Sequence, residues 1–176
     1  LHFLREREPE SYAGIVDTVR LAVPFFGDFD IAPLAVNPDR VMLNWHERGT
    51  DYSLAPNQLS DGSLRFIALY TLLLQPDDRL PAAIVLDEPE LGLHPYAINL
   101  LGSMVREASD VSQVVLATQS ALLVDEFEPQ DVVVVDRTQG GSEFSRLAPS
   151  ELAEWLERYS LGELWEKNVI GGGTAP

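Results

Sequence analysis

Two adjacent carboxylates, Asp87 and Glu88, follow the apolar run 82–86 and precede Pro89. A continuous apolar run that contains β-branched residues is typical of a parallel strand covered on both faces. Acidic groups at the carboxyl end of such a strand lie where open α/β sheets bind ligands. One carboxylate could hold Mg²⁺, directly or through water, while the other takes a proton from an attacking water; phosphoryl transfer needs both. The alternative is a solvated acidic turn, which is common in a chain with 28 acidic residues.

The stretch 59–63, Leu-Ser-Asp-Gly-Ser, begins a predicted helix that extends to about Gln75. Its Ser60 can cap the helix, and Gly62 lets backbone N–H groups approach a ligand closely. A helix N-terminus with a hydroxyl group and exposed amides is an arrangement that binds phosphate. Without neighbouring motifs, an ordinary capped helix start would be the better interpretation.

Gln119 lies in the sequence Ala-Thr-Gln-Ser that ends the predicted strand 113–117. The carboxyl ends of parallel strands meet at one edge of a sheet, so we expect Gln119 beside Asp87 and Glu88. From there its amide could donate a hydrogen bond to a phosphate oxygen or orient a water. On its own, a polar strand end is usually only a turn or a cap.

Hydrophobic periodicity and turn residues predict the elements that would position these groups. The predicted helices are 11–23, about 57–75, 95–108, 121–127 and 149–159, the last with Ser150 as N-cap. The predicted strands are 40–45, 52–54, 82–86, 113–117, the buried strand 131–135 and the edge strand 143–147. We predict a loop or irregular arm for 25–38, anchored by Phe25, Phe26 and Phe29, and a mobile tail for 171–176. Strands that alternate with helices predict an α/β fold, in which a mainly parallel sheet has flanking helices and right-handed crossovers.

Composition excludes several classes of function. The 176 residues carry a formal net charge of −16, and Lys167 is the only lysine. Because nucleic-acid binding requires a basic surface, we do not expect this chain to bind nucleic acid directly. No apolar run is long enough to cross a bilayer, and the first residues do not make a signal peptide. The absence of cysteine suits a reducing compartment, so we expect a cytoplasmic protein without membrane contact. The histidines are not spaced as zinc ligands; they are His2, His46 and His94.

The order of the three polar stretches resembles that of the ABC-type ATPases, in the branch of the SMC and RecF-like proteins and their stand-alone relatives. In that family a signature motif (here 59–63) precedes a Walker B strand (84–88), a D-loop (89–95) and a switch residue (Gln119). The D-loop sequence Pro-Glu-Leu-Gly-Leu-His-Pro is more similar to RecF-like ATPases than to transporter ATPases, and the ending 159–165 also resembles that branch. The resemblance implies a P-loop NTPase fold, with an ATPase core over 40–148, a helical and loop arm over 1–39, and a helical tail over 149–176.

The resemblance also implies a role for each matched residue. Asp87 would support Mg²⁺ through its water shell, Glu88 would be the general base or water-orienting carboxylate, and Gln119 would sense the γ-phosphate of ATP. Signature residues would contact the γ-phosphate of ATP held by a second subunit; they are Ser60, Asp61, Gly62 and Ser63. D-loop residues would line the contact between the two nucleotide sites of a head-to-tail homodimer; they are Leu91, Gly92, Leu93 and His94. The implied cofactors are ATP and Mg²⁺.

Two departures from the family pattern limit the expected activity. Gln119 stands where many relatives have His, and a neutral amide cannot carry a positive charge, so we expect slow or differently coupled turnover. The P-loop pattern Gly-x-x-x-x-Gly-Lys-[Ser/Thr] is absent, and in this family it lies upstream of every motif found here. We therefore interpret the chain as the C-terminal half of such an ATPase, inactive alone, whose P-loop half is missing or supplied by another polypeptide.

Three functional hypotheses follow. The first is an ATP-binding, Mg-dependent ATP-hydrolysing module that closes as a head-to-tail dimer, with DNA repair and phage defence as candidate processes. The second is an interaction or regulatory module that keeps the ATPase fold and uses its acidic surface to contact a basic partner. The third is a protein that works with a nuclease or another DNA-associated partner. This hypothesis rests on family analogy alone.

Overall fold

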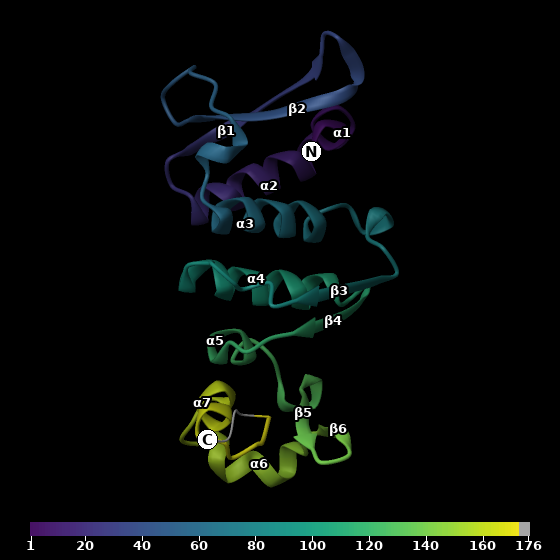
Figure 1. The fold of residues 1–176 in the computed structure, drawn as a ribbon, viewed down its shortest axis with the longest axis vertical. Helices are drawn as coiled ribbons and strands as arrows, with labels where there is room; N and C mark the ends of the chain where they lie inside the picture. Colours follow the sequence, from purple (N-terminus) through teal and green to yellow (C-terminus); the bar gives the residue numbers. More distant parts are fainter. Residues whose placement is uncertain (173–176) are drawn as a thin grey trace.

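The structure, a computed structural model, describes residues 1–172 and arranges them as a column of layers along one long axis (Figure 1). The helices are His2–Arg7 (α1), Pro9–Ala22 (α2), Asp61–Leu73 (α3), Pro95–Ala108 (α4), Ala121–Val124 (α5), Pro149–Leu156 (α6) and Leu161–Glu166 (α7). The strands are Phe26–Leu34 (β1), Asn37–Glu47 (β2), Ala83–Asp87 (β3), Gln113–Ala117 (β4), Val133–Thr138 (β5) and Gly141–Arg146 (β6). Within the described residues, no helix is long and apolar enough to cross a membrane.

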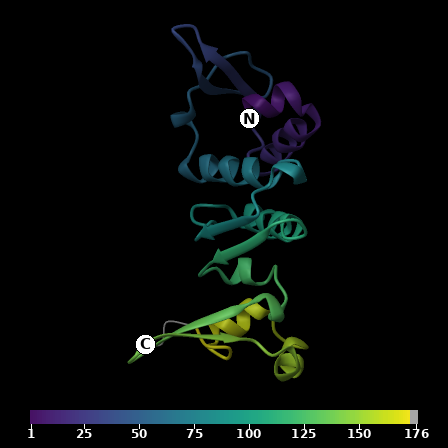
Figure 2. The same cartoon turned by 90° about the vertical axis from the view of Figure 1, so that its right-hand side faces the viewer.

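The layer at the N-terminal end is an antiparallel hairpin of β1 and β2 that lies beside α1 and α2 (Figures 1 and 2). The prediction of a loop or irregular arm for 25–38 is wrong, because β1 occupies most of that segment. Its Pro, Gly and Asp residues indicated breaks, but Gly27 lies at an irregularity of the strand register, where it is tolerated. Phe26 and Phe29 are buried, with ring centroids 4.7 Å apart, and this burial outweighs the local preference for a loop. Phe25, the third predicted anchor, is 52% exposed.

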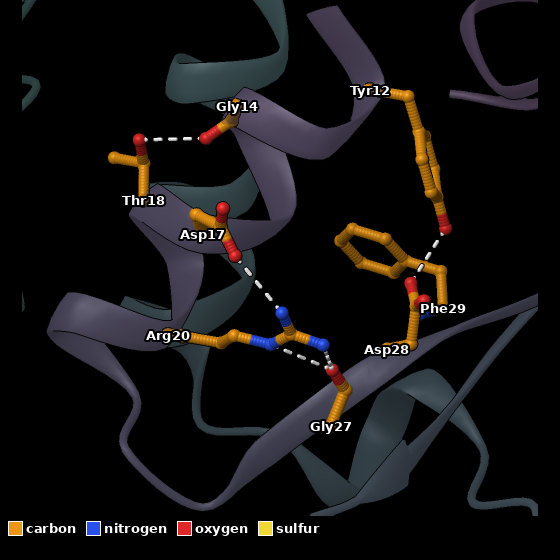
Figure 3. A network of polar contacts seen from close by, with 8 residues as sticks. All are labelled: Tyr12, Gly14, Asp17, Thr18, Arg20, Gly27, Asp28 and Phe29. Carbon is orange, nitrogen blue, oxygen red and sulfur yellow. Dashed lines mark hydrogen bonds and ion pairs between the residues drawn. The ribbon is translucent and has the colours of Figure 1, made fainter. Parts of the chain in front are cut away.

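Polar contacts from α2 fix the hairpin in place (Figure 3). The Tyr12 hydroxyl donates a hydrogen bond of 2.7 Å to Oδ1 of Asp28. The guanidinium of Arg20 donates to the carbonyl oxygen of Gly27 at 2.9 Å through Nε and forms an ion pair of 2.9 Å with Asp17. The acidic and glycine residues that looked like loop signals in the sequence therefore serve as acceptors for the neighbouring helix.

Alkaline pH is expected to destabilise the fold through Tyr12 and Tyr70. Burial raises the pKa of both phenols above the ordinary value of 10.0, and the hydrogen bond to Asp28 adds to the effect at Tyr12. The folded chain thus keeps protons that the unfolded chain loses above that pH. The stabilisation is fully present below about pH 10 and falls by about 1.4 kcal/mol per pH unit for each tyrosine above it.

Urea unfolding between about pH 9 and about pH 11 measures this slope. Tyr12→Phe and Tyr70→Phe should each reduce the slope of unfolding free energy against pH by about 1.4 kcal/mol per pH unit, the contribution of one tyrosine. An unchanged slope in both variants would show that neither phenol causes the alkaline loss of stability.

The middle layers contain α3, α4 and the parallel pair β3–β4 (Figure 2). The helix α4 connects the two strands, whose register extends from the pair Ala83 and Gln113 to the pair Asp87 and Ala117. Tyr70 is fully buried in α3, and its hydroxyl donates to the carbonyl oxygen of Ala97 in α4 at 3.2 Å. The predicted strand–helix–strand unit is confirmed, and both α4 and β4 have their predicted bounds.

One face of the β3–β4 pair is open. Ile84 and Leu86 are buried, whereas Val85 is 76% exposed and its register partner Val115 is 53% exposed. The prediction that both faces of β3 are covered is therefore wrong for the described residues. The face that carries the two valines also carries Asp87, because alternate residues of a strand point to the same side.

The prediction of a mainly parallel sheet is also corrected by the structure. The described strands form three separate two-stranded sheets, and only the β3–β4 pair is parallel. The strand β5, predicted as a third buried strand, pairs with β6 in an antiparallel hairpin. Val134 is buried there, but Val133 and Val135 on its other face are 41% and 46% exposed. The apolar run was correctly assigned to a strand, although its composition could not show which strand it pairs with.

The C-terminal layer joins the β5–β6 hairpin to α6 and α7. The predicted N-cap Ser150 is wrong, because α6 starts at Pro149 after Ala148 and has no side-chain cap. Asp125, next to α5, accepts hydrogen bonds from the Gly162 amide at 2.6 Å and the Ser160 hydroxyl at 3.0 Å, which ties α7 to the middle layers. Of the predicted mobile tail, 171–172 lie against β5, where the Gly172 amide donates to Asp136 at 2.8 Å, and 173–176 lie outside the described residues.

Candidate functional site

The carboxyl ends of β3 and β4 bring the predicted catalytic groups to one edge. Asp87 is the register partner of Ala117, and the Glu88 amide continues the pairing by donating to the Ala117 carbonyl at 2.8 Å. Glu88 then turns the chain with a φ of 42°, a left-handed conformation that costs energy for a residue other than glycine. This turn ends the strand and sets the direction of the Glu88 side chain.

Gln119 holds the side chain of Glu88. Its Nε2 donates a hydrogen bond of 2.9 Å to Oε1 of Glu88, so the two segments that follow the parallel strands meet through their side chains. Gln119 is exposed and Glu88 is half-buried. Asp87 is exposed, and its side chain makes no hydrogen bond or ion pair with the described side chains, those of residues 1–37 and 40–172. A carboxylate fixed by an amide, with a second carboxylate open to solvent beside it, is suited to orienting a water next to a bound cation.

A second carboxylate contact at this edge was not predicted. Glu90 is only 8% exposed, and its Oε1 accepts hydrogen bonds from the Thr118 hydroxyl at 2.5 Å and the Gln119 amide at 3.3 Å. The switch segment is therefore joined to the Walker B strand through Glu88 and to the D-loop through Glu90. The signal in the sequence was weak, because a single Glu in an acidic turn is normally solvated.

The signature segment begins α3 as predicted. The Ser60 Oγ accepts a hydrogen bond from the Ser63 amide at 3.1 Å, and the hydroxyl groups of these two residues lie 2.9 Å apart. Ser60 and Asp61 are exposed, while Gly62 and Ser63 are half-buried. The cap uses one of the free amides at the helix start, and it leaves the exposed hydroxyl of Ser60 at the surface.

The signature helix touches the D-loop through two glycines. A Cβ built on Gly62 would overlap the carbonyl oxygen of Gly92, so the backbones approach as closely as only glycine allows. Gly92 itself has a φ of +77°, which also favours glycine. Arg65 of α3 lies near the same turn, with Nη1 3.5 Å from the carbonyl oxygen of Glu88. The two predicted motifs thus form one continuous surface with the Glu88 turn.

The rest of the D-loop faces solvent. Leu91 is 51% exposed, and Gly92 and His94 are exposed as well, while Leu93 is half-buried against the core. Nδ1 of His94 accepts a hydrogen bond of 3.4 Å from the Tyr96 amide, so His94 is the N-cap of α4. An exposed leucine beside a glycine turn is compatible with a contact surface for another chain.

The residues at this edge fit Mg²⁺ only together with a nucleotide. Within residues 1–172, no group of three or more acidic, histidine or cysteine side chains could hold a metal ion. Mg²⁺ in phosphoryl-transfer enzymes is bound by one or two carboxylates together with phosphate oxygens and water. Asp87 would supply such a carboxylate, and the remaining ligands would come from phosphate and water.

Solved structures with a similar fold define the class of this protein. An SMC ATPase described for ATP-driven dimerization and DNA-stimulated activation is 16% identical, with a TM-score of 0.60, and the match covers 88% of this chain and 93% of that chain. The Smc head bound to the C-winged helix domain of ScpA is 12% identical, with a TM-score of 0.65, and 82% and 44% of the two chains are covered. The Smc head of Pyrococcus furiosus with an extended coiled coil, bound to the C-terminal domain of ScpA, is 15% identical, with a TM-score of 0.62 and coverage of 84% and 37%.

These likenesses show the fold: the chain is an α/β NTPase-type module with the ABC/SMC-like ATPase fold, as its motifs predicted. The chain spans less than half of the two Smc heads bound to ScpA domains. A protein-family model described as "AAA domain, putative AbiEii toxin, Type IV TA system" matches residues 3–125, and the chain belongs to this family. No curated protein matches the chain.

Proposed function

We propose that the chain carries the signature, Walker B, D-loop and switch residues of an ATPase that binds ATP with Mg²⁺ and works as a head-to-tail dimer. The hydrogen bond from Gln119 to Glu88 is the observation that carries this proposal. It fixes a carboxylate beside the exposed Asp87, at the edge where α/β sheets bind ligands. Bound Mg²⁺ would supply charge neutralisation at the phosphates.

Each of these residues has a separate task in the proposed reaction. Glu88 orients the attacking water and accepts its proton, because its carboxylate is held in one direction by Gln119. Gln119 would donate its second amide proton to the γ-phosphate, which would couple the position of Glu88 to the presence of ATP. Asp87 would hold Mg²⁺ through its water shell, because its side chain is exposed and has no partner among the described side chains.

Two surfaces support the proposed assembly. The D-loop presents Leu91 and the Gly92 turn to solvent beside the signature helix, which is where a second subunit would dock. The open face of β3–β4 presents Val85 and Val115 next to Asp87, and a segment that contains a P-loop would cover it. The SMC ATPase with a similar fold is described as undergoing ATP-driven dimerization. DNA repair and phage defence are the candidate processes in which this assembly would work.

ATP binding and hydrolysis by two polypeptides tests the proposal. We expect the 176-residue chain alone to bind Mg–ATP weakly and not to hydrolyse it, since it contains no P-loop pattern. A longer polypeptide, extended at its N-terminus to include a P-loop, should both bind and hydrolyse Mg–ATP. Strong hydrolysis by the 176-residue chain would contradict the need for a P-loop segment, and failure of the longer polypeptide to bind ATP would contradict the function.

A charge on the open sheet face provides a sharper test in the same experiment. Val85→Asp should reduce ATP binding by the longer polypeptide by more than about tenfold, because burial of a valine contributes about 1.5–3 kcal/mol and a buried carboxylate adds a penalty. Val36→Asp, on a side chain that is 98% exposed, is the matched control and should have no effect. Equal effects of both substitutions would show that the open face is not a docking surface.

The same experiment tests the second hypothesis, an interaction or regulatory module that keeps the fold. The net charge of −16 and the missing P-loop pattern favour it. That function predicts that no P-loop partner restores ATP binding and that a basic protein binds the chain in a salt-dependent manner.

A further inference from the structure

Glu90 is the one buried carboxylate among the side chains that the structure describes, those of residues 1–37 and 40–172. It is 8% exposed, and no basic side chain in this described part of the chain is buried to the same degree. A charged side chain is almost never buried without a specific reason, because removing it from water is costly. The role of Glu90 is not explained by the proposed reaction, in which Glu88 and Gln119 perform the chemistry.

The side-chain hydrogen bonds of Glu90 all go to the switch segment. Its Oε1 accepts from the Thr118 hydroxyl and from the Gln119 backbone amide, at 2.5 and 3.3 Å. The Thr118 oxygen in turn accepts a hydrogen bond from the Ser120 amide at 3.0 Å, so one carboxylate oxygen organises three consecutive residues. These residues carry the side chain that reaches Glu88, because the Gln119 amide group donates to Glu88 at 2.9 Å.

The second oxygen of Glu90 argues against a role in stability alone. Within the described residues, Oε2 is buried and has no hydrogen-bond partner. Such an oxygen loses its hydration without compensation, which makes the carboxylate an expensive way to hold two loops together. The burial of Glu90 is instead explained by the positions that its hydrogen bonds impose on Thr118 and Gln119.

We propose that Glu90 is a positioning residue that holds the switch segment so that the Gln119 side chain stays bonded to Glu88. It links the D-loop, which faces the proposed partner subunit, to the carboxylate that orients water. Its importance for turnover rests on the proposed function, whereas the geometric link between Glu90 and Gln119 does not.

Nuclear magnetic resonance of the 176-residue chain tests the geometric link without ATP. The side-chain amide of Gln119, identified by its loss in Gln119→Ala, should give a restrained signal that is distinct from the signal of the exposed Gln113. In Glu90→Ala, we expect the Gln119 signal to shift to the position and mobility of the Gln113 signal. Glu90→Gln keeps an acceptor oxygen and should restore most of the restraint.

A second variant keeps the test decisive if Glu90→Ala does not fold. Thr118→Val removes the hydroxyl donor and should move the Gln119 signal in the same direction. Thr138→Val, which removes a hydroxyl from the distant β5–β6 hairpin, is the matched control and should leave the signal in place. An unchanged Gln119 signal in the folded variants, or an equal change in the control, would overturn the proposal.

Turnover provides the functional readout. In the ATP-hydrolysing polypeptide, Glu90→Ala should lower kcat by about tenfold with little change in KM, because it disturbs the position of catalytic groups, while the phosphate contacts of the P-loop do not involve Glu90. Partial recovery of kcat in Glu90→Gln would support positioning, and a change in KM alone would contradict it. If no polypeptide hydrolyses ATP, the proposed function fails while the resonance experiment still decides the role of Glu90.

Discussion

Replacing Glu88 with Gln is expected to lower ATP turnover by about 10²- to 10⁴-fold in the polypeptide that includes a P-loop. The substitution removes the proton acceptor but keeps the shape of the side chain and one oxygen that can accept the hydrogen bond from Gln119. The left-handed backbone at this residue should be unaffected, because Glu and Gln have the same requirement there. Chemistry should therefore fail while the architecture of the site persists.

Two measurements separate these effects. Steady-state hydrolysis gives the turnover, and light scattering with and without ATP gives the oligomeric state. ATP-dependent dimers of Glu88→Gln should form as in the unaltered protein, and should last longer because ATP is not consumed. Glu107→Gln, at an exposed acid of α4, is the matched control and should change neither quantity. Loss of dimerisation in Glu88→Gln would instead assign Glu88 a structural role.

The common edge of Asp87, Glu88 and Gln119 could be predicted from chain order. Polar residues follow two apolar strands that are joined by a single helix, and parallel strands necessarily end at the same edge. The structure places Asp87 opposite Ala117 and joins Glu88 to Gln119 as this argument requires. The assigned roles of these residues in ATP chemistry remain predictions.

Glu90 and the contact between Gly62 and Gly92 could not be predicted in the same way. Nothing in the local sequence distinguishes a buried glutamate from a solvated one in an acidic turn, because burial depends on how Thr118 packs against it. The glycine contact joins segments far apart in the chain, and one sequence contains no signal for such a pairing. Both features depend on tertiary packing and not on periodicity.

The same distinction explains the errors in the fold. The helix α4 and the strand β4 have clear periodicity and terminate at strong local signals, so their bounds were predicted correctly. The strand β1 contains Gly and Pro, and it forms because Phe26 and Phe29 are buried between the hairpin and the helices. The strand β5 was assigned as buried from composition, but the pairing with β6 leaves one of its faces open.

Replacing Gly62 with Ala is expected to destabilise the chain by about 1–3 kcal/mol, the usual cost of forcing an extra methyl group into a packed site. The new Cβ would overlap the carbonyl oxygen of Gly92, and this oxygen belongs to backbone that is held by the turn between Glu90 and α4. A backbone atom cannot move aside as the end of a flexible side chain can. The midpoint of thermal unfolding should fall by about 2–4 °C for each kcal/mol.

Gly14→Ala is the matched control for this prediction. Gly14 lies in the helix α2, and, apart from its chain neighbours and the nearby backbone of that helix, no atom lies within 4 Å of the position that an added methyl group would take. Alanine should therefore stabilise the chain by about 0.5–1 kcal/mol through its better helix propensity. Urea unfolding of both variants measures the difference. If Gly62→Ala were as stable as Gly14→Ala, the signature helix and the D-loop would not be in contact.

Because both segments belong to the proposed dimer surface, a real contact also predicts that Gly62→Ala weakens ATP-dependent dimerisation more than its loss of stability alone explains.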